Sequence, residues 1–372
     1  MACAAVIPGA ARAASAAGVS DTEIVLAQVM DLTGPLAGLT ADIANAAKAW
    51  FDKVNQSGGI NGRSVRLITA DDGYVVANTV KVVNDLIEKE KVFAFFNMTG
   101  TSNVAAILPR LEQETPPVPI VGMFTGAQEL RAPLRRNVFH LRASYADETS
   151  RLIEHLDTIG LKRISVLYLD NGFGKDGLAG TEEAMAKHGI KPVAVVPVKQ
   201  DASDVANAVT TLGAVQQDAI ILISAGRVTR DFIKQFSARR TGAQFYCLSV
   251  MGAQATVHAL GSDGVGVVVV SVVPFPWSRA NAVASEYRRL MQAAGHSEVS
   301  FAGLESFLNA KVVTEVLRRA GRDLTRTRFI ESLEGMDRFD LGGVAVGFNR
   351  SQHVGSRFVD LTIIGTDRKF KQ

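Results

Sequence analysis

The stretch Glu23-Ile24-Val25-Leu26-Ala27-Gln28-Val29-Met30 is apolar along almost its whole length and predicts a buried β-strand. Apolar side chains at helical spacing follow over residues 41–55, and a Gly-Gly-Ile-Asn-Gly-Arg turn at 58–63 leads into a second strand over 64–70. A strand, a helix and another strand in this order predict parallel strands with right-handed crossovers.

The alternation continues through the chain and starts again in its second half. Further strands are predicted over 92–97, 118–123, 163–169, 193–198, 219–223, 244–250 and 265–273. Helices are predicted over 75–89, 102–114, 176–188, 205–212, 229–240 and 253–260, with three more over 280–294, 301–320 and 327–334. Residues 342–370 show the pattern of strands and turns. The sequence therefore predicts an α/β protein with two similar, doubly wound Rossmann-like units.

The composition argues against several classes of protein. The 372 residues carry 40 basic and 37 acidic side chains, a balance that does not indicate a nucleic-acid partner. The longest uncharged apolar run, 264–277, is shorter than the roughly 18 residues that a membrane-spanning helix needs. Cys3 and Cys247 cannot form a metal-binding CxxC framework, and the histidines lack metal-ligand spacing. We expect no metal and no cofactor.

The first twenty residues resemble a targeting segment. Residues 1–20 are rich in alanine, lack acidic side chains, and contain the A-x-A triplets 11–13 and 14–16 that a signal peptidase recognises. No basic residue precedes the short apolar stretch, so a low-complexity cytoplasmic tail is the alternative. We expect a signal peptide, shortened at its start, and export to the periplasm.

Gly172-Phe173-Gly174-Lys175-Asp176-Gly177 matches the GxGxxG pattern of dinucleotide-binding loops. Asp170 would place a negative charge where a pyrophosphate must lie, which favours a glycine loop that only permits a tight turn and the start of a helix. No GxSxG motif is present, and Asp71-Asp72 is most simply a loop-capping pair. We expect that the protein is not an enzyme. The alternative is a nucleotide-dependent enzyme that uses residues 172–177.

Small polar loops follow two of the predicted strands. Residues 97–103 and 123–127 combine hydroxyl groups with the free backbone N–H groups of a helix start, which together can bind a carboxylate. Open α/β sheets bind their ligands at this edge. The basic run 131–136 has no interleaved aromatic residue and predicts a solvated turn.

Several motifs follow the order and spacing of one family. They are 33–37, 58–63, Asp71-Asp72, 124–127, 142–148 and 170–177. From Glu23 onward the chain resembles the periplasmic binding proteins of ABC transporters that are similar to the leucine/isoleucine/valine-binding protein. The resemblance implies a type 1 periplasmic binding fold, with a ligand cleft between two lobes joined by a three-crossing hinge. We expect residues 21–142 plus 275–341 in lobe 1, and 143–274 plus 342–372 in lobe 2.

The resemblance also implies the ligand-binding residues. In this family a hydroxyl and backbone N–H groups hold the ligand carboxylate, an aromatic residue covers the ligand, and further residues of the second lobe close the cleft. Carried onto this sequence, these residues are Gly100, Thr101, Ser102, Thr125, Gly126, Tyr145, Asp147, Phe173 and Ala225.

Three departures from the family bear on the ligand. Leu39 and Ala225 stand where amino-acid binders have aromatic residues, and 249–254 contains no glutamate for a ligand ammonium. An unpaired ammonium in a dry cleft is costly, so an aromatic or aliphatic acid fits at least as well as an amino acid. We expect a monomeric solute-binding protein that delivers a small carboxylate to an ABC permease. A cytoplasmic sensor of the same fold is the alternative.

Overall fold

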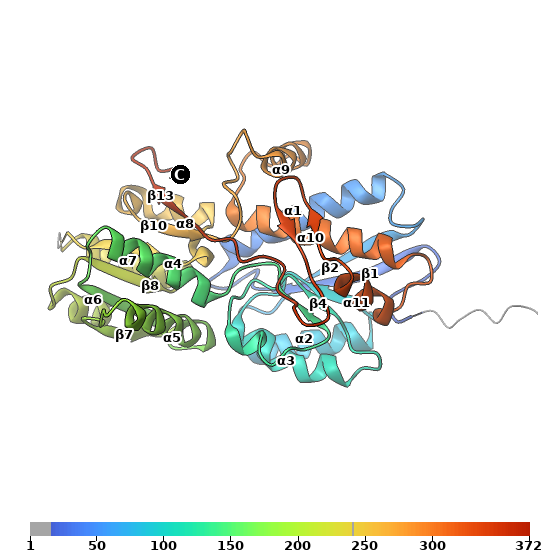
Figure 1. Ribbon diagram of the computed structural model, residues 1–372, viewed down its shortest axis with the longest axis horizontal. Coiled ribbons are helices and arrows are strands. Elements are labelled where there is room, and N and C mark those ends of the chain that lie inside the picture. The colour runs from blue at the N-terminus through green and yellow to red at the C-terminus, as the bar shows by residue number, and fades with distance from the viewer. Residues whose placement is uncertain (1–15, 240–241) are drawn as a thin grey trace, which may run out of the picture.

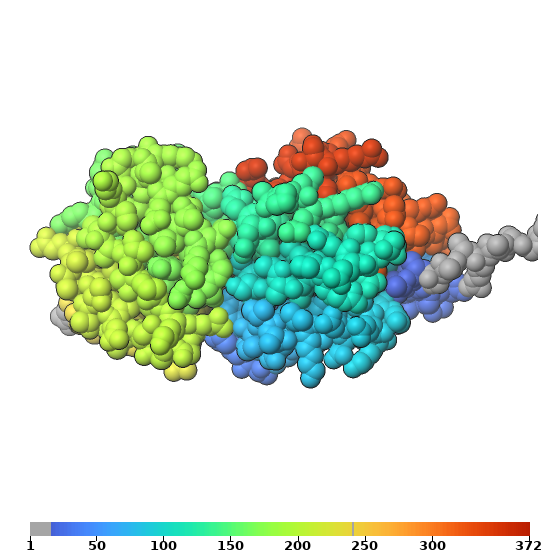
Figure 2. Space-filling view, turned by 90° about the horizontal axis from the view of Figure 1, so that it is seen from below, coloured from blue at the N-terminus to red at the C-terminus, as the bar shows by residue number. Residues whose placement is uncertain are grey.

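The computed structural model describes residues 16–239 and 242–372, so most of the expected signal peptide lies outside the described residues. Two α/β lobes lie end to end along the long axis of the molecule (Figure 1), and each is built around its own sheet. Seen from below, the two lobes meet over a broad face (Figure 2).

Lobe 1 contains a parallel five-stranded sheet in the order β2-β1-β3-β4-β5. Its strands are β1 (Glu23–Met30), β2 (Ser64–Asp71), β3 (Ala94–Phe96), β4 (Ile120–Val121) and β5 (Val138–Phe139). Its helices are α1 (Ala37–Gln56), α2 (Val76–Glu88), α3 (Thr101–Gln113), α9 (Ala282–Ala293), α10 (Phe301–Ala320) and α11 (Arg326–Glu334). β1 pairs with β2 along its whole length, from Glu23 beside Ser64 to Met30 beside Asp71.

Lobe 2 contains a seven-stranded sheet in the order β14-β13-β10-β9-β8-β6-β7. Its strands are β6 (Ile164–Leu169), β7 (Val195–Val198), β8 (Ala219–Ile223), β9 (Gln244–Cys247), β10 (Val268–Ser271), β13 (Asp360–Ile364) and β14 (Phe370–Lys371). Its helices are α4 (Tyr145–Thr158), α5 (Gly172–Lys187), α6 (Val205–Gly213), α7 (Gly226–Ser237) and α8 (Gln254–Leu260). β6 to β10 are parallel, whereas β13 and β14 each run antiparallel to their neighbour.

The chain passes between the lobes three times, which confirms the predicted fold. The first crossing joins β5 to α4, the second joins β10 to α9, and the third leads to β13 from the hairpin of β11 (Phe339–Asp340) and β12 (Ala345–Val346). The residue boundaries of 21–142 plus 275–341 and 143–274 plus 342–372 remain a proposal. Within the described residues, no helix is both long enough and apolar enough to cross a membrane.

Most predicted elements agree with the structure within a few residues, and the strands 23–30 and 219–223 and the helix 301–320 agree at both ends. Two assignments are wrong. The glycine-rich segment from Gly172 is the first turn of α5 and not a loop, because the side chain of Asn171 accepts the N–H of Gly174 and starts the helix there. No helix was predicted where α4 lies, although a capping box formed by Ser144 and Asp147 begins it.

Candidate functional site

The two polar loops of lobe 1 lie against each other. The Oγ1 atoms of Thr101 and Thr125 are 2.7 Å apart, and both side chains are buried. Gly100 precedes α3 with φ +90°, a conformation that favours glycine. A Cβ at Gly100 would also lie 2.7 Å from the ring of Tyr74. Glycine here therefore gives the aromatic ring room beside the threonine pair.

Lobe 2 places two aromatic rings over these loops. The ring centroids of Tyr145 and Phe173 are 4.9 Å apart, and both side chains are almost completely buried. Tyr145 is held at the loop because its N–H donates to the carbonyl of Gly126 at 2.9 Å. A Cβ at Gly126 would lie 2.5 Å from that backbone nitrogen, so only glycine permits this approach. The structure thus brings Thr101, Thr125, Gly126, Tyr145 and Phe173 together.

Further hydrogen bonds connect the lobes around this group. The N–H of Gly172 donates to Oγ of Ser102 at 3.1 Å, and the N–H of Gln128 donates to the carboxylate of Asp176 at 2.8 Å. The side-chain amide of Gln200 donates to the carbonyl of Tyr74 at 3.3 Å. The lobes are therefore in contact, in a closed arrangement.

Gly174 and Gly177 serve packing within lobe 2, whereas Gly172 faces lobe 1, where an added Cβ would lie 2.8 Å from Oγ of Ser102. A Cβ at Gly174 would lie 1.8 Å from the carbonyl oxygen of Leu169, and one at Gly177 would lie 2.5 Å from the side chain of Ile223. Glycine at these positions lets α5 lie directly on β6 and β8, so the GxGxxG pattern has a structural explanation without a pyrophosphate. In the described part of the chain, no three His, Cys, Asp or Glu side chains gather as a metal site would require.

Asp147 and Ala225 lie at the edges of the group. Both the N–H and the hydroxyl of Ser144 donate to one carboxylate oxygen of Asp147, at 2.9 and 2.7 Å. The other carboxylate oxygen of Asp147 lies 3.5 Å from the guanidinium of Arg357. Asp147 therefore caps α4. Ala225 is buried and packs with Leu36 and Tyr74 in a small cluster that lies between the lobes.

Tyr74 was not identified from the sequence, although it follows the Asp71-Asp72 pair. Its φ of +60° is rare for a residue with a side chain, and Asp72 holds it by accepting its N–H at 2.9 Å. Burial raises the pKa of the Tyr74 hydroxyl, which also hydrogen-bonds Asn171 of the other lobe. The acidic pair is thus loop-capping, as the sequence indicated, but its effect is to place an aromatic hydroxyl at the interface of the lobes.

A buried charge cluster lies behind the aromatic rings, where the first crossing meets α10. The guanidinium of Arg142 is 3.3 Å from the carboxylate of Glu148 in lobe 2 and 3.7 Å from that of Glu305 in lobe 1. It also donates to Oγ of Ser249, whose own N–H and hydroxyl donate to Glu148 at 2.8 and 2.9 Å.

Burial dominates the ionisation of this cluster. It raises the pKa of Glu148, and it raises the pKa of Glu305 to about 7 although the charge of Arg142 opposes the shift. Burial alone would lower the pKa of Arg142, but the charges of Glu305 and Glu148 raise it. The cluster therefore holds two carboxyl groups of raised pKa around one cation.

The basic run 131–136 is only partly the solvated turn that the sequence predicted. Arg136 and Leu134 are exposed, but the guanidinium of Arg131 donates to the carbonyls of Arg142 and Ala143, both at 3.1 Å. Burial lowers the pKa of Arg131 to about 10. Arg131 thus braces the first crossing, which the local sequence does not reveal.

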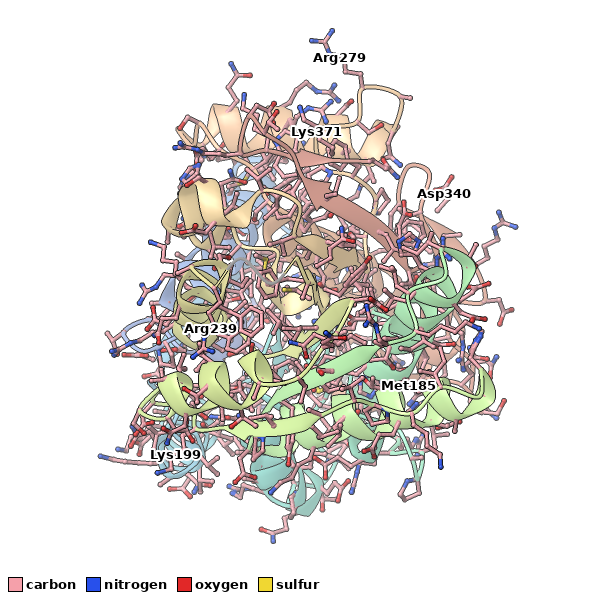
Figure 3. The ribbon with its side chains drawn as sticks, turned by 90° about the vertical axis from the view of Figure 1, so that its left-hand side faces the viewer. Met185, Lys199, Arg239, Arg279, Asp340 and Lys371 are labelled. Carbon is pink, nitrogen blue, oxygen red and sulfur yellow. The ribbon has the colours of Figure 1, made fainter. Side chains whose placement is uncertain are left out.

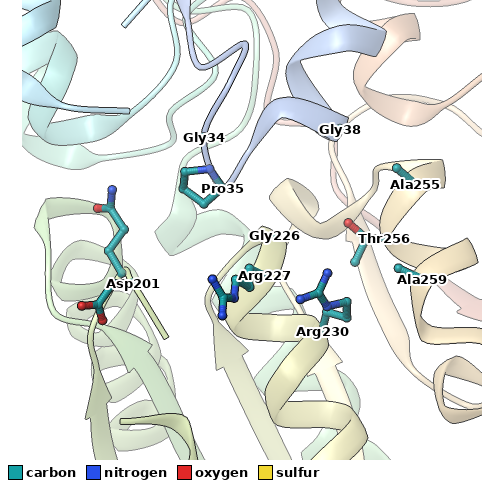
Figure 4. A pocket seen from close by; sticks show the side chains of 11 residues that line it. Gly34, Pro35, Gly38, Asp201, Gly226, Arg227, Arg230, Ala255, Thr256 and Ala259 are labelled. Carbon is teal, nitrogen blue, oxygen red and sulfur yellow. The ribbon is translucent and has the colours of Figure 1, made fainter. Parts of the chain in front are cut away.

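A cavity of about 680 Å³ opens between the lobes at the edge of this interface (Figure 4). One wall is the start of α1 with Gly34, Pro35 and Gly38, and the other includes Arg227 and Arg230 of α7. None of the nine predicted site residues is among those that line it.

A family described as "Periplasmic binding protein" matches residues 23–367. The sequence has no match among curated proteins. A substrate-binding periplasmic protein from Ralstonia solanacearum is 30% identical, with a TM-score of 0.87 over 92% of this chain and 98% of that one. An extracellular ligand-binding receptor from Verminephrobacter eiseniae is 27% identical, with a TM-score of 0.86 over 94% of this chain and 100% of that one. A possible leucine/isoleucine/valine-binding protein from Rhodopirellula baltica is 25% identical, with a TM-score of 0.89 over 97% and 98% of the two chains.

Proposed function

The chain belongs to the periplasmic binding protein family, and on that premise we propose that it captures a small carboxylate between its lobes and delivers it to an ABC permease. We include in the proposal that it acts as a monomer in the periplasm, that residues 1–20 direct its export, and that it catalyses no reaction.

One observation carries the proposal. The buried hydroxyls of Thr101 and Thr125 lie at the start of α3, where backbone N–H groups lack helical partners, and aromatic rings from the other lobe cover them. In the closed arrangement the two hydroxyls bond to each other, and Ser102 bonds to Gly172. Opening of the lobes would break the bond between Ser102 and Gly172 and expose the two threonine hydroxyls, which both belong to lobe 1, to the oxygens of a carboxylate.

The body of the ligand faces apolar surface. Tyr74, Tyr145 and Phe173 are neutral aromatic residues, and the acids behind them, Glu148 and Glu305, are already engaged with Arg142. This arrangement favours an acid with an aryl or alkyl body over one that requires a free carboxylate for its ammonium group.

Proteins that share the fold at low identity take either kind of ligand. One from Thermus thermophilus was solved with valine, and one from R. palustris with benzoate; each is 16% identical to this chain. At that distance the likeness concerns the fold, so the two ligand classes must be separated by experiment.

A thermal-shift panel on the chain from Val19 onward tests the proposal. Benzoate, phenylacetate and isovalerate would be compared with their amides, and isovalerate with valine. A ligand at one hundred times its dissociation constant stabilises the protein by about 2.7 kcal/mol, enough for a clear rise in melting temperature. We expect stabilisation by at least one acid and none by its amide.

The Thr101→Val, Thr125→Val double variant is the matched control, because it keeps side-chain volume and removes both hydroxyls. It should lose the stabilisation by the acid. Stabilisation by amides equal to that by acids, or an unchanged response of the double variant, would contradict a carboxylate site at these residues.

A further inference from the structure

A second cavity, away from the proposed ligand site, lies beside the second crossing. It has a volume of about 1270 Å³, and we call it the crossing cavity. Its walls come from α8 of lobe 2, from residues 275–277 of the crossing itself, from α9 and residues 295–299 of lobe 1, and from residues 367–372 at the end of the chain. None of the residues assigned above to the proposed ligand site lines it.

The floor of the crossing cavity is aromatic. The ring centroid of Trp277 lies 5.1 Å from that of Phe275 and 5.8 Å from that of Phe370, with the last pair stacked. Phe301 supports both Trp277 and Phe370 from below, at 5.5 and 5.1 Å. Phe275 and Trp277 retain exposed surface, so their faces are available to an apolar body.

The rim of the crossing cavity is basic. Its two acids are Asp367, which pairs with Lys371 at 2.6 Å, and the exposed Glu298, which lies 3.7 Å from His258. Arg288, Arg368 and Lys369 also line the cavity, and no described carboxylate lies within ion-pair distance of any of them. Figure 3 shows Lys371 toward the same edge of the molecule as Arg279.

Arg288 is the most informative of these cations because it is partly buried and fixed in place. Its guanidinium donates to the carbonyls of Pro276 and Ser278, at 2.6 and 2.8 Å, and to Oγ of Ser285 at 2.9 Å. These partners are neutral, and the charges that reach it are those of Arg279 and Arg289. A fixed, uncompensated cation beside aromatic faces is the chemistry that recognises an amphipathic anion.

We propose that the crossing cavity binds a carboxylate with an acyl or aryl body, independently of the site between the lobes. The apolar body lies on Phe275 and Trp277, which Phe370 supports from behind, and the carboxylate faces Arg288 and Lys369 at the rim. Because α8 belongs to lobe 2 and α9 to lobe 1, an anion in the cavity contacts both lobes and stabilises the relative position in which they form it.

Trp277 provides a direct readout, because Trp50 is the other of the two tryptophans in the sequence. Trp50 lies in α1, where its Nε1 donates to Thr314. In a Trp50→Phe variant, fluorescence comes from Trp277 alone. The probe is 11-bromoundecanoate below its micellar concentration, since bromine quenches indole fluorescence on contact. We expect saturable quenching, and a dissociation constant at least about tenfold weaker for 11-bromoundecanol, which lacks the charge.

Two sets of rim variants complete the experiment. Arg288→Gln should weaken the binding of 11-bromoundecanoate, but it also removes three structural hydrogen bonds. The double variant Arg368→Gln, Lys369→Gln removes charge alone, because no described residue pairs with either side chain. We expect the double variant to bind 11-bromoundecanoate about tenfold more weakly and to bind 11-bromoundecanol with unchanged affinity.

A Phe173→Ala variant separates this inference from the proposed function. Quenching of Trp277 should be unaffected by Phe173→Ala, which alters the site between the lobes. Non-saturable quenching, equal affinity for the acid and the alcohol, or loss of quenching in Phe173→Ala would overturn the crossing-cavity proposal. The last outcome would mean that binding in the crossing cavity depends on the site between the lobes, and the first two would leave the proposed function standing.

Discussion

The backbone N–H of Gly172 donates a hydrogen bond across the two lobes to Oγ of Ser102, at 3.1 Å. Each partner lies at the start of a helix, α5 in lobe 2 and α3 in lobe 1. The bond therefore exists only while the lobes are closed, and it links closure directly to a loop that we propose receives the ligand.

Replacing Ser102 with alanine tests this link. Ser102→Ala should destabilise the closed state by about 1 kcal/mol, a roughly fivefold loss of affinity for the bound acid, with little change in the melting of the free protein. Titration calorimetry measures the affinity. Ser57→Ala, which removes an exposed hydroxyl bonded within α1, is the control and should change neither quantity.

Gly226 controls how closely the lobes approach each other. It begins α7 with φ +56°, and a Cβ there would lie 2.2 Å from the carbonyl oxygen of Pro35 in lobe 1. Gly226→Ala should therefore obstruct closure and reduce affinity by more than tenfold. Small-angle scattering with ligand present should show a larger radius of gyration than for the wild type.

The matched control for that variant is Gly189→Ala. Gly189 has a similar φ of +66°, but nothing lies within 4 Å of an added Cβ. Both variants carry the backbone strain of a left-handed residue, about 1 kcal/mol, and only Gly226→Ala adds the contact between lobes. If the two variants lose affinity equally, strain and not the Pro35 contact is the cause.

Phe173 is predicted to contribute to ligand binding more than to the stability of lobe 2. Its ring is buried against Tyr145 next to Gly172, which bonds Ser102 of lobe 1, so Phe173→Ala removes apolar surface beside the contact between the lobes. We expect a loss of about 1.5 to 3 kcal/mol in binding free energy. Phe236→Ala, in the core of lobe 2, should instead lower the melting temperature strongly, since such truncations cost about 3 to 5 kcal/mol. A larger fall in melting temperature for Phe173→Ala than for Phe236→Ala would show that Phe173 is chiefly a core residue.

The buried charge cluster predicts a pH dependence of stability. Burial raises the pKa of Glu305 from 4.5 to about 7. A carboxyl with a raised pKa binds its proton more tightly in the folded chain, so its contribution to the free energy of unfolding is complete below about pH 4.5 and is lost as the pH rises through 7. The difference in unfolding free energy between wild type and Glu305→Gln should fall by about 2 to 3 kcal/mol between pH 5 and 8.

Urea denaturation of both proteins at several pH values measures this difference. The neutral amide keeps the shape of the protonated acid, so the variant corrects for titrating groups that do not interact with Glu305. A difference that stays constant across the range would mean that Glu305 does not change its protonation there.

The sequence alone determined the layered fold, because alternating periodicity needs no distant partner to be recognised. The buried run 23–30 and the apolar helix 301–320 agree with the structure at both ends. Local rules also explain the misses: the capping box at Ser144 was present in the sequence, and the glycines after Asn171 concealed a helix start whose cap is a single side-chain bond.

Only the tertiary structure decided how the lobes meet and what lies between them. Tyr74, Arg142 and Glu305 are far apart in the chain. Arg142 stands in the motif 142–148, but no local pattern links it to Glu305 or marks Tyr74, and folding alone brings the three behind or beside the predicted loops. The same holds for the crossing cavity, where Trp277 and Phe370 stack from segments nearly a hundred residues apart. Periodicity reflects which face of an element is buried, whereas a site between elements depends on contacts that no local pattern encodes.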